Sequence, residues 1–122
     1  MVKLNYTLLI LFILFLSSCS SLTPLEVNNT LPTYTKSMFY TPKQATEKQK
    51  SDKCKLLIKG RNYVAPIGFA PKNDLKNAAK GIDEWVELDG GNAYVLINFK
   101  WVTVGDDGST QLHIDFDTMQ CK

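Results

Sequence analysis

The stretch "AYVLINFKWVTVGDDGSTQLHIDFDTMQC", residues 93–121, decides the fold of this chain. Its first half is rich in β-branched and aromatic residues, "GDDG" is typical of a turn, and its second half alternates apolar and polar residues. The pattern predicts two antiparallel strands joined by a loop with an even number of residues. One face of this hairpin should carry the apolar side chains of Val95, Ile97, Phe99 and Trp101, across from Leu112, Ile114 and Phe116.

The opposite face of the hairpin is polar, and we expect it to be open to solvent or to a ligand. Its residues are Asn98, Lys100, His113, Asp115 and Asp117. Three of them carry metal-binding groups, but a strand places such groups in a line about 7 Å apart. No second histidine or free thiol completes a tetrahedral site. The pattern therefore favours a solvated face over a metal site.

The residues before the hairpin predict a helix that covers its apolar face. Apolar side chains recur there at helical spacing, and "DGG" at residues 89–91 is typical of a helix end. Asn73 or Asp74 is expected to cap the start, and Gly81 marks either a close contact or a weak point. The predicted buried stripe consists of Leu75, Ala78, Ala79, Ile82, Trp85 and Val86.

The N-terminus has the pattern of an export signal. Lys3 supplies a basic start, "TLLILFILFL" at residues 7–16 is a hydrophobic stretch of signal-peptide length, and "LSSC" at residues 16–19 resembles the lipobox of bacterial lipoproteins. This resemblance implies removal of residues 1–18 and diacylation of Cys19. A transmembrane helix needs about 20 apolar residues, about twice the number present. The alternative is an ordinary secretory signal in which Cys19 is incidental.

An acylated Cys19 places the protein in the cell envelope, because two acyl chains hold a protein stably in a membrane. Ser20 after that cysteine resembles the pattern sorted to the outer membrane. In a bacterium with two membranes, we therefore expect a lipid anchor in the outer membrane and a domain that faces the periplasm. The expected partners are the membrane itself and other envelope proteins.

Cys54 and Cys121 are the remaining cysteines, and in an exported protein such a pair normally closes a disulfide. "CKLLIKGRNYV", residues 54–64, predicts a strand, so a bridge requires its start to lie beside the end of the last strand. The predicted fold is α+β, a three-stranded β-α-β-β sheet with the last strand in the middle and one helix on its apolar face. The alternative, a redox or metal-binding thiol pair, does not suit a spacing so far from CxxC.

Residues 52–122 are predicted to form one small globular domain, and residues 19–51 a lipidated N-terminus and flexible tether. Residues 20–51 mix Thr, Ser, Asn, Pro and Lys without helical or alternating periodicity. Pulled taut, such a tether would reach about 100 Å. Its one apolar island, "YTKSMFY" at residues 34–40, either docks on the domain's own surface or binds a partner.

Charge and motifs narrow the classes of function. The chain has 14 basic and 12 acidic side chains and lacks the clustered basic face of a nucleic-acid-binding protein. It has one histidine, no GxSxG nucleophile elbow and no free reactive thiol, so we expect neither an enzyme nor a cofactor. Two hypotheses remain: an envelope interaction or stress-sensing module, and a small-ligand or metal-binding periplasmic lipoprotein.

The run "LKNAAKGIDEWVELDGGNAYVLI", residues 75–97, followed by a last strand that ends in cysteine, resembles small bacterial envelope lipoproteins of the DUF4156 family. The matching positions are Gly91, Asn92, Ala93 and Cys121. A resemblance to the stress-sensor lipoproteins of the Rcs phosphorelay is more distant, because those carry four cysteines in the domain where this chain has two. Both resemblances imply a membrane-tethered domain that contacts other proteins and has no chemistry of its own.

Overall fold

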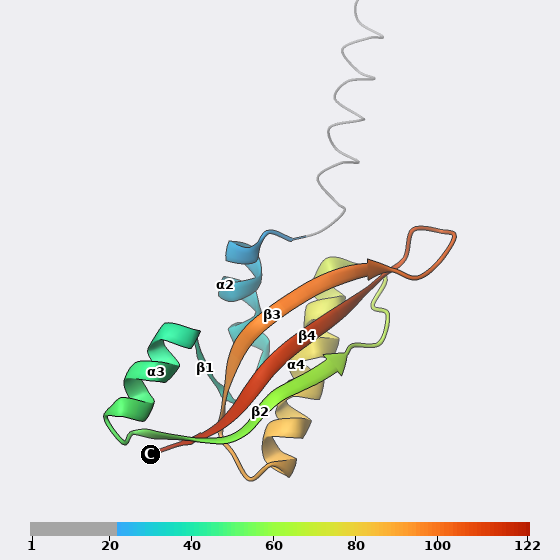
Figure 1. Ribbon diagram of the computed structural model, residues 1–122. Helices are drawn as coiled ribbons and strands as arrows, with labels where there is room; N and C mark the ends of the chain where they lie inside the picture. Colours follow the sequence, from blue (N-terminus) through green and yellow to red (C-terminus); the bar gives the residue numbers. More distant parts are fainter. Residues whose placement is uncertain (1–21) are drawn as a thin grey trace, which may run out of the picture.

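The computed structural model describes residues 22–122, and it has an α+β fold built around one four-stranded sheet (Figure 1). The predicted signal peptide, residues 1–18, and the predicted lipid attachment at Cys19 lie outside the described residues. In chain order, the elements are α2 (Pro24–Tyr34), β1 (Met38–Tyr40), α3 (Pro42–Lys50), β2 (Cys54–Val64), α4 (Pro71–Leu88), β3 (Ala93–Thr103) and β4 (Thr110–Cys121).

The strand order, β1-β3-β4-β2, confirms most of the predicted topology. The last strand, β4, lies between β3 and β2 and pairs antiparallel with both, so β2 and β3 run parallel. The crossover between them contains α4, which covers one face of the sheet. The predicted count of three strands is wrong, because the short strand β1 adds parallel to the outer edge of β3.

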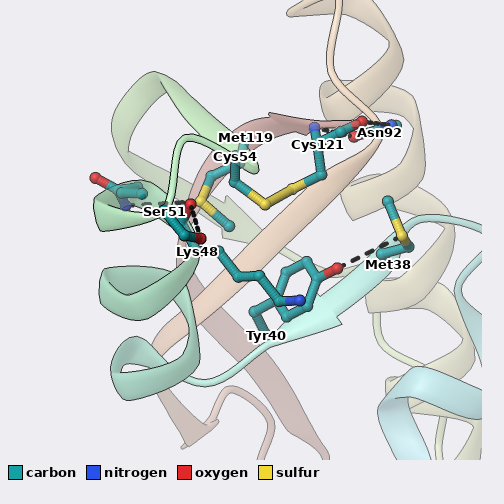
Figure 2. Close-up of a disulfide and its surroundings, with 9 residues drawn as sticks. Met38, Tyr40, Lys48, Ser51, Cys54, Asn92, Met119 and Cys121 are labelled. Carbon is teal, nitrogen blue, oxygen red and sulfur yellow. Dashed lines mark hydrogen bonds between the residues drawn. A yellow bond between two sulfur atoms is a disulfide. The ribbon is translucent and has the colours of Figure 1, made fainter.

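The predicted disulfide joins Cys54 at the start of β2 to Cys121 at the end of β4 (Figure 2). The two residues lie directly opposite each other in the antiparallel pair. Asn92, just before β3, fastens the same end: its side-chain amide donates to the Cys121 carbonyl (2.8 Å) and its Oδ1 accepts from the Cys121 amide (2.8 Å). The bridge and these bonds tie β2, β4 and the start of β3 together.

Strand β3 contains a β-bulge that the alternation of its residues did not reveal. Leu96 lies opposite Phe116, but Asn98 lies opposite Asp115. Ile97 is therefore an extra residue with no counterpart in β4. Before the bulge, the even-numbered side chains of β3 face α4. After it, the odd-numbered side chains do.

The bulge corrects the predicted apolar face of the hairpin. Phe99 and Trp101, which follow the bulge, pack against the main core below α4 as predicted. The prediction for Val95 is wrong, because Val95 is buried on the opposite face, in a smaller cluster under α3. The prediction for Ile97 is also wrong, since this residue lies at the bulge and is 49% exposed. The predicted partners in β4 are buried in the main core: Leu112, Ile114 and Phe116.

Helix α4 presents the predicted apolar stripe to the sheet. Five of the six residues of the stripe are buried. The sixth, Trp85, is partly buried and packs against the main core. Gly81 lies against the ring of Tyr63 in β2, where an added Cβ would come within 2.1 Å of a ring carbon, so the glycine permits a close contact. The helix begins at Pro71, before the predicted caps, and Asp74 is buried instead of capping it.

Residues 22–51 form two helices and a strand, where the sequence predicted a flexible tether. Both helices begin at a Thr-Pro pair. The side chain of Thr23 accepts a hydrogen bond from the Glu26 amide, and that of Thr41 accepts one from the Gln44 amide. Proline follows each threonine at the first helical position, where its missing N–H costs nothing.

Helix α2 is held to the domain by packing and by one carboxylate. Val27 and Leu31 are fully buried in the main core. Lys36 and Ser37 follow α2, and both are bonded to Asp83 of α4. The Asp83 carboxylate accepts hydrogen bonds from the amides of Lys36 (2.8 Å) and Ser37 (3.0 Å) and from the Ser37 hydroxyl (2.7 Å). The "YTKSMFY" segment therefore docks on the domain itself, which is one of the two alternatives that the sequence left open.

Candidate functional site

The outer edge of β3 is covered along only part of its length. Strand β1 pairs with its first three residues, Ala93–Val95. It then ends at Tyr40, because Thr41 caps α3 and the chain turns away. Over Leu96–Thr103, no other strand of the described chain lies along this edge (Figure 1). We call Leu96–Thr103 the free edge of β3.

Backbone groups on the free edge point away from the sheet at every second residue. In the β3–β4 hairpin, the amide of Val104 donates to the carbonyl of Ser109 (2.9 Å). Hydrogen-bonded and non-bonded pairs alternate along an antiparallel ladder, so Phe99, Trp101 and Thr103 direct their N–H and C=O groups outward. Within the part of the chain that the structure describes, no backbone hydrogen bond reaches these groups, and an added strand can use them.

An open hollow of about 410 Å³ lies beside the free edge, where β1 ends. Its walls come from the start of α2, the turn from β1 into α3, and the bulge of β3. Phe39, Ile97 and Phe99 give it apolar surface, and Asn28 and Asn98 give it polar groups. The volume lies at the low end of the range for ligand pockets and suits a side chain of an added strand.

The predicted polar face is present on the side of the sheet away from α4. Lys100 lies opposite His113, and Asn98 lies opposite Asp115, so the expected cross-strand neighbours meet. Asp117 follows on the same face of β4, two residues after Asp115. The structure therefore gathers the predicted residues on one face, as a row along the strands.

Both aspartates of this face are already engaged by β2. Asp115 accepts a hydrogen bond from Asn62 Nδ2 (2.6 Å), and Asp117 accepts one from the backbone amide of Gly60 (2.8 Å). Gly60 has a φ of +79°, a left-handed conformation that glycine adopts most readily. The two carboxylates therefore stabilise an irregular part of β2, which is a structural role.

His113 is half-buried, and its Nε2 has no hydrogen-bond partner among the described residues. Between residues 22 and 122, no group of three His, Cys, Asp or Glu side chains is arranged to hold a metal ion. His113 Nε2 is therefore the buried polar side-chain atom that lacks a partner in the described part of the chain.

A cluster around Asp89, which sequence patterns did not predict, fastens β2 to the rest of the fold. Arg61 of β2 donates two hydrogen bonds to Asp89, just after α4, and its guanidinium carbon lies 4.1 Å from the centre of the Trp85 ring. Thr118 of β4 donates a further bond to Asp89 (2.8 Å). The hydrogen bonds from Arg61 hold the pKa of Asp89 below its usual range.

Asp74 forms a second buried polar junction that the sequence did not reveal. Its carboxylate accepts hydrogen bonds from the Gly68 amide (2.7 Å), from Trp101 Nε1 (3.4 Å) and from the Thr110 hydroxyl (3.5 Å). These bonds tie the loop before α4 to both strands of the hairpin. The only available signal was the position of Asp74 directly before Leu75, at the edge of the apolar stripe.

From residue 22 onward, no helix is both long enough and apolar enough to cross a membrane. The resemblance to the DUF4156 lipoproteins stays a prediction. A comparison of the chain with protein-family models, with curated proteins and with solved structures found no match.

Proposed function

We propose that the chain is a membrane-anchored bacterial lipoprotein that acts as an envelope interaction or stress-sensing module, and that it binds an extended segment of another envelope protein along the free edge of β3. The observation that carries this proposal is the row of unpaired backbone groups at Phe99, Trp101 and Thr103. An extended segment that adds to a sheet edge gains affinity from main-chain hydrogen bonds and specificity from pockets for alternate side chains.

The surroundings of the free edge define the chemistry of the bound segment. The hollow beside Ile97 receives one apolar side chain of the segment. Lys100 is the only charged residue of β3, so an acidic residue beside it in the added strand is favourable. The segment should also lack proline at the positions that bond to the edge, because proline has no N–H to donate.

An anchor at Cys19 supports the same function, because it confines the free edge to the membrane in which other envelope proteins lie. The lipobox-like tetrad "LSSC" and the resemblance of residues 75–97 to the DUF4156 lipoproteins both favour an anchored, non-catalytic domain. The alternative, a small-ligand or metal-binding lipoprotein, would use the polar face. The hydrogen bonds that Asp115 and Asp117 make to β2 count against it.

Site-specific photo-crosslinking in intact cells tests this proposal. A photoreactive phenylalanine analogue replaces either Ile97 on the free edge or Asn62 on β2, both of which are exposed. We expect a crosslinked protein from position 97 and none from position 62. Thr103→Pro removes one outward amide and should abolish the adduct, whereas Thr103→Ala keeps that amide and should retain it.

Thermal unfolding of each variant serves as the control for folding. Equal adducts at the two positions, or an adduct at position 97 that survives Thr103→Pro in a folded protein, would contradict binding by strand addition.

A further inference from the structure

The loop between β2 and α4, together with the residue at each end of it, is an apolar segment with several exposed side chains. Residues 64–71, "VAPIGFAP", contain no charged side chain. Phe69 is 82% exposed, the largest value for any large apolar residue of the described chain, and Val64 and Ile67 of the same segment are exposed as well. Apolar side chains gathered in this way on a surface indicate a contact site.

Hydrogen bonds to α4 hold this loop in shape. Gly68 donates its amide to Asp74 (2.7 Å), and Asn77 donates to the carbonyl of Pro66 (3.2 Å). Phe69 itself has a φ of +63°, a backbone conformation that bulky side chains rarely adopt. The fold therefore holds the aromatic ring of Phe69 in solvent on a fixed backbone. A turn without this left-handed residue would be enough to connect β2 to α4.

The loop lies at the end of the molecule where the described chain begins. Figure 1 shows the start of α2, the start of α4 and the β3–β4 loop at this end, with α3 and the C-terminus at the other. Leu25, in the first turn of α2, is 69% exposed, and Val104, just after β3, is 45% exposed. One end of the domain therefore presents apolar side chains from three separate segments.

The described part of the fold reaches very close to the predicted anchor. Leu22 already packs against the main core, and α2 begins at Pro24. Only Ser20 and Ser21 separate Leu22 from Cys19, and three residue steps span at most about 10 Å. A lipid on Cys19 therefore brings this end of the domain to the membrane surface.

We propose that this end of the domain docks on the lipid bilayer, with Phe69 and Leu25 among the lipid headgroups. The inference rests on the proposed anchor and adds an orientation to it. Aromatic rings favour the membrane–water interface, and apolar side chains lose contact with water when they enter it. Lys72 follows the loop, and Asp106 and Asp107 lie in the adjacent β3–β4 turn, so this end is not basic. The contact should therefore not require anionic lipids.

Fluorescence quenching in phosphatidylcholine vesicles tests the docking with the acylated mature chain. Phe69→Trp places a reporter in the loop, and Leu88→Trp places a matched reporter at the other end of α4, where Leu88 is 77% exposed. We expect the emission added by Phe69→Trp to shift to shorter wavelength in vesicles and to lose intensity when the lipid is brominated. The emission added by Leu88→Trp should show neither change.

Ile67→Trp is the second reporter if Phe69→Trp lowers the midpoint of thermal unfolding. Equal quenching at the two ends, or acrylamide access to the loop reporters that vesicles do not reduce, overturns the docking and leaves the anchor intact. The mass of the mature chain reports on the anchor separately. A mass without acyl chains overturns the proposed anchor, and the orientation with it.

Discussion

The two edges of the sheet differ in how they are protected. The pairing of β2 with β4 shifts register between Leu56 and Ile58 and again between Ile58 and Arg61. Lys55 and Lys59 lie in the same part of β2, and both are exposed. Bulges and lysines are the devices by which proteins keep an edge strand from pairing with another chain. These features therefore disfavour the pairing of the β2 edge with a strand of another chain.

The free edge of β3 has less of this protection, with one bulge and one lysine. After the bulge at Ile97, its pairing with β4 is regular through Thr103, and Lys100 is its only charge. A hollow also opens beside it. Both edges belong to the same sheet, but the edge of β3 is the more accessible to another strand. Its accessibility is therefore a property of that edge and not of the sheet as a whole. The contrast supports strand addition at β3 and not at β2.

Removing the disulfide should have the largest effect, and it should loosen the β2 edge first. Cys54 and Cys121 are 67 residues apart, and the loss of a bridge of that span costs about 4 kcal/mol in the free energy of unfolding. Urea unfolding of the Cys54→Ser/Cys121→Ser variant measures the loss, and hydrogen exchange locates it. Faster exchange in β3 than in β2 would reverse the order that we expect for the two edges.

Asp83→Ala should have the next largest effect, because it releases β1 and lengthens the free edge of β3. The substitution removes the acceptor of the hydrogen bonds from Lys36 and Ser37, and we expect a loss of about 2 kcal/mol in the free energy of unfolding. Glu84→Ala, at the neighbouring exposed position, is the matched control and should change that energy by less than about 0.5 kcal/mol.

Hydrogen exchange at Met38–Tyr40 shows whether the strand is released. Exchange there should accelerate in Asp83→Ala and stay unchanged in Glu84→Ala. If β1 remains as protected in Asp83→Ala as in the parent, the carboxylate does not hold it, and the length of the free edge is set by packing alone.

Acid should have the smallest effect, and it should act on β2. The hydrogen bonds from Arg61 lower the pKa of Asp89 in the folded state. Their stabilisation is therefore complete above the unfolded-state pKa of about 3.9 and is lost as the pH falls through the lower folded-state pKa. The effect is small because Arg61 remains partly exposed and solvent screens the pair.

Urea unfolding between about pH 7 and about pH 2 checks this difference. The Asp89→Asn variant should lack part of the acid dependence of the parent, and its β2 amides should exchange faster at neutral pH. Identical pH profiles for the parent and Asp89→Asn would show that Asp89 does not fasten β2 through its charge.

Long, strongly patterned segments made much of this fold predictable. The hairpin and the stripe of α4 followed from periodicity, and the strand order followed from the pairing of Cys54 with Cys121. The bulge at Ile97 did not follow, because alternation assumes that each residue advances the ladder by one step. An inserted residue reverses the face of every later side chain and leaves the composition unchanged.

The N-terminal elements were missed for a different reason. Helices α2 and α3 are short, and α2 depends on the burial of Val27 and Leu31 against the core, which a local pattern does not show. The available signals were the Thr-Pro pairs at residues 23–24 and 41–42, each of which starts a helix.

The candidate site was predictable only in its polar part. The alternation in "HIDFD" gave the residues of the polar face, but the bonds of Asp115 and Asp117 depend on irregularities of β2. The free edge of β3 depends on the end of β1 at Tyr40, which in turn depends on the cap of α3. No property of the β3 sequence itself reveals that its partner strand is short.

If Cys19 carries the lipid that we propose, the packing of Leu22 against the core also limits where the protein can meet a partner. With Cys19 acylated, the domain occupies a layer roughly 35 Å thick, the diameter of a compact unit of about 100 residues. A flexible tether would have let it explore about 100 Å. The thinner layer concentrates the free edge toward partners in the same membrane. Encounters then depend on lateral diffusion in the plane of the membrane, and proteins beyond that layer are out of range.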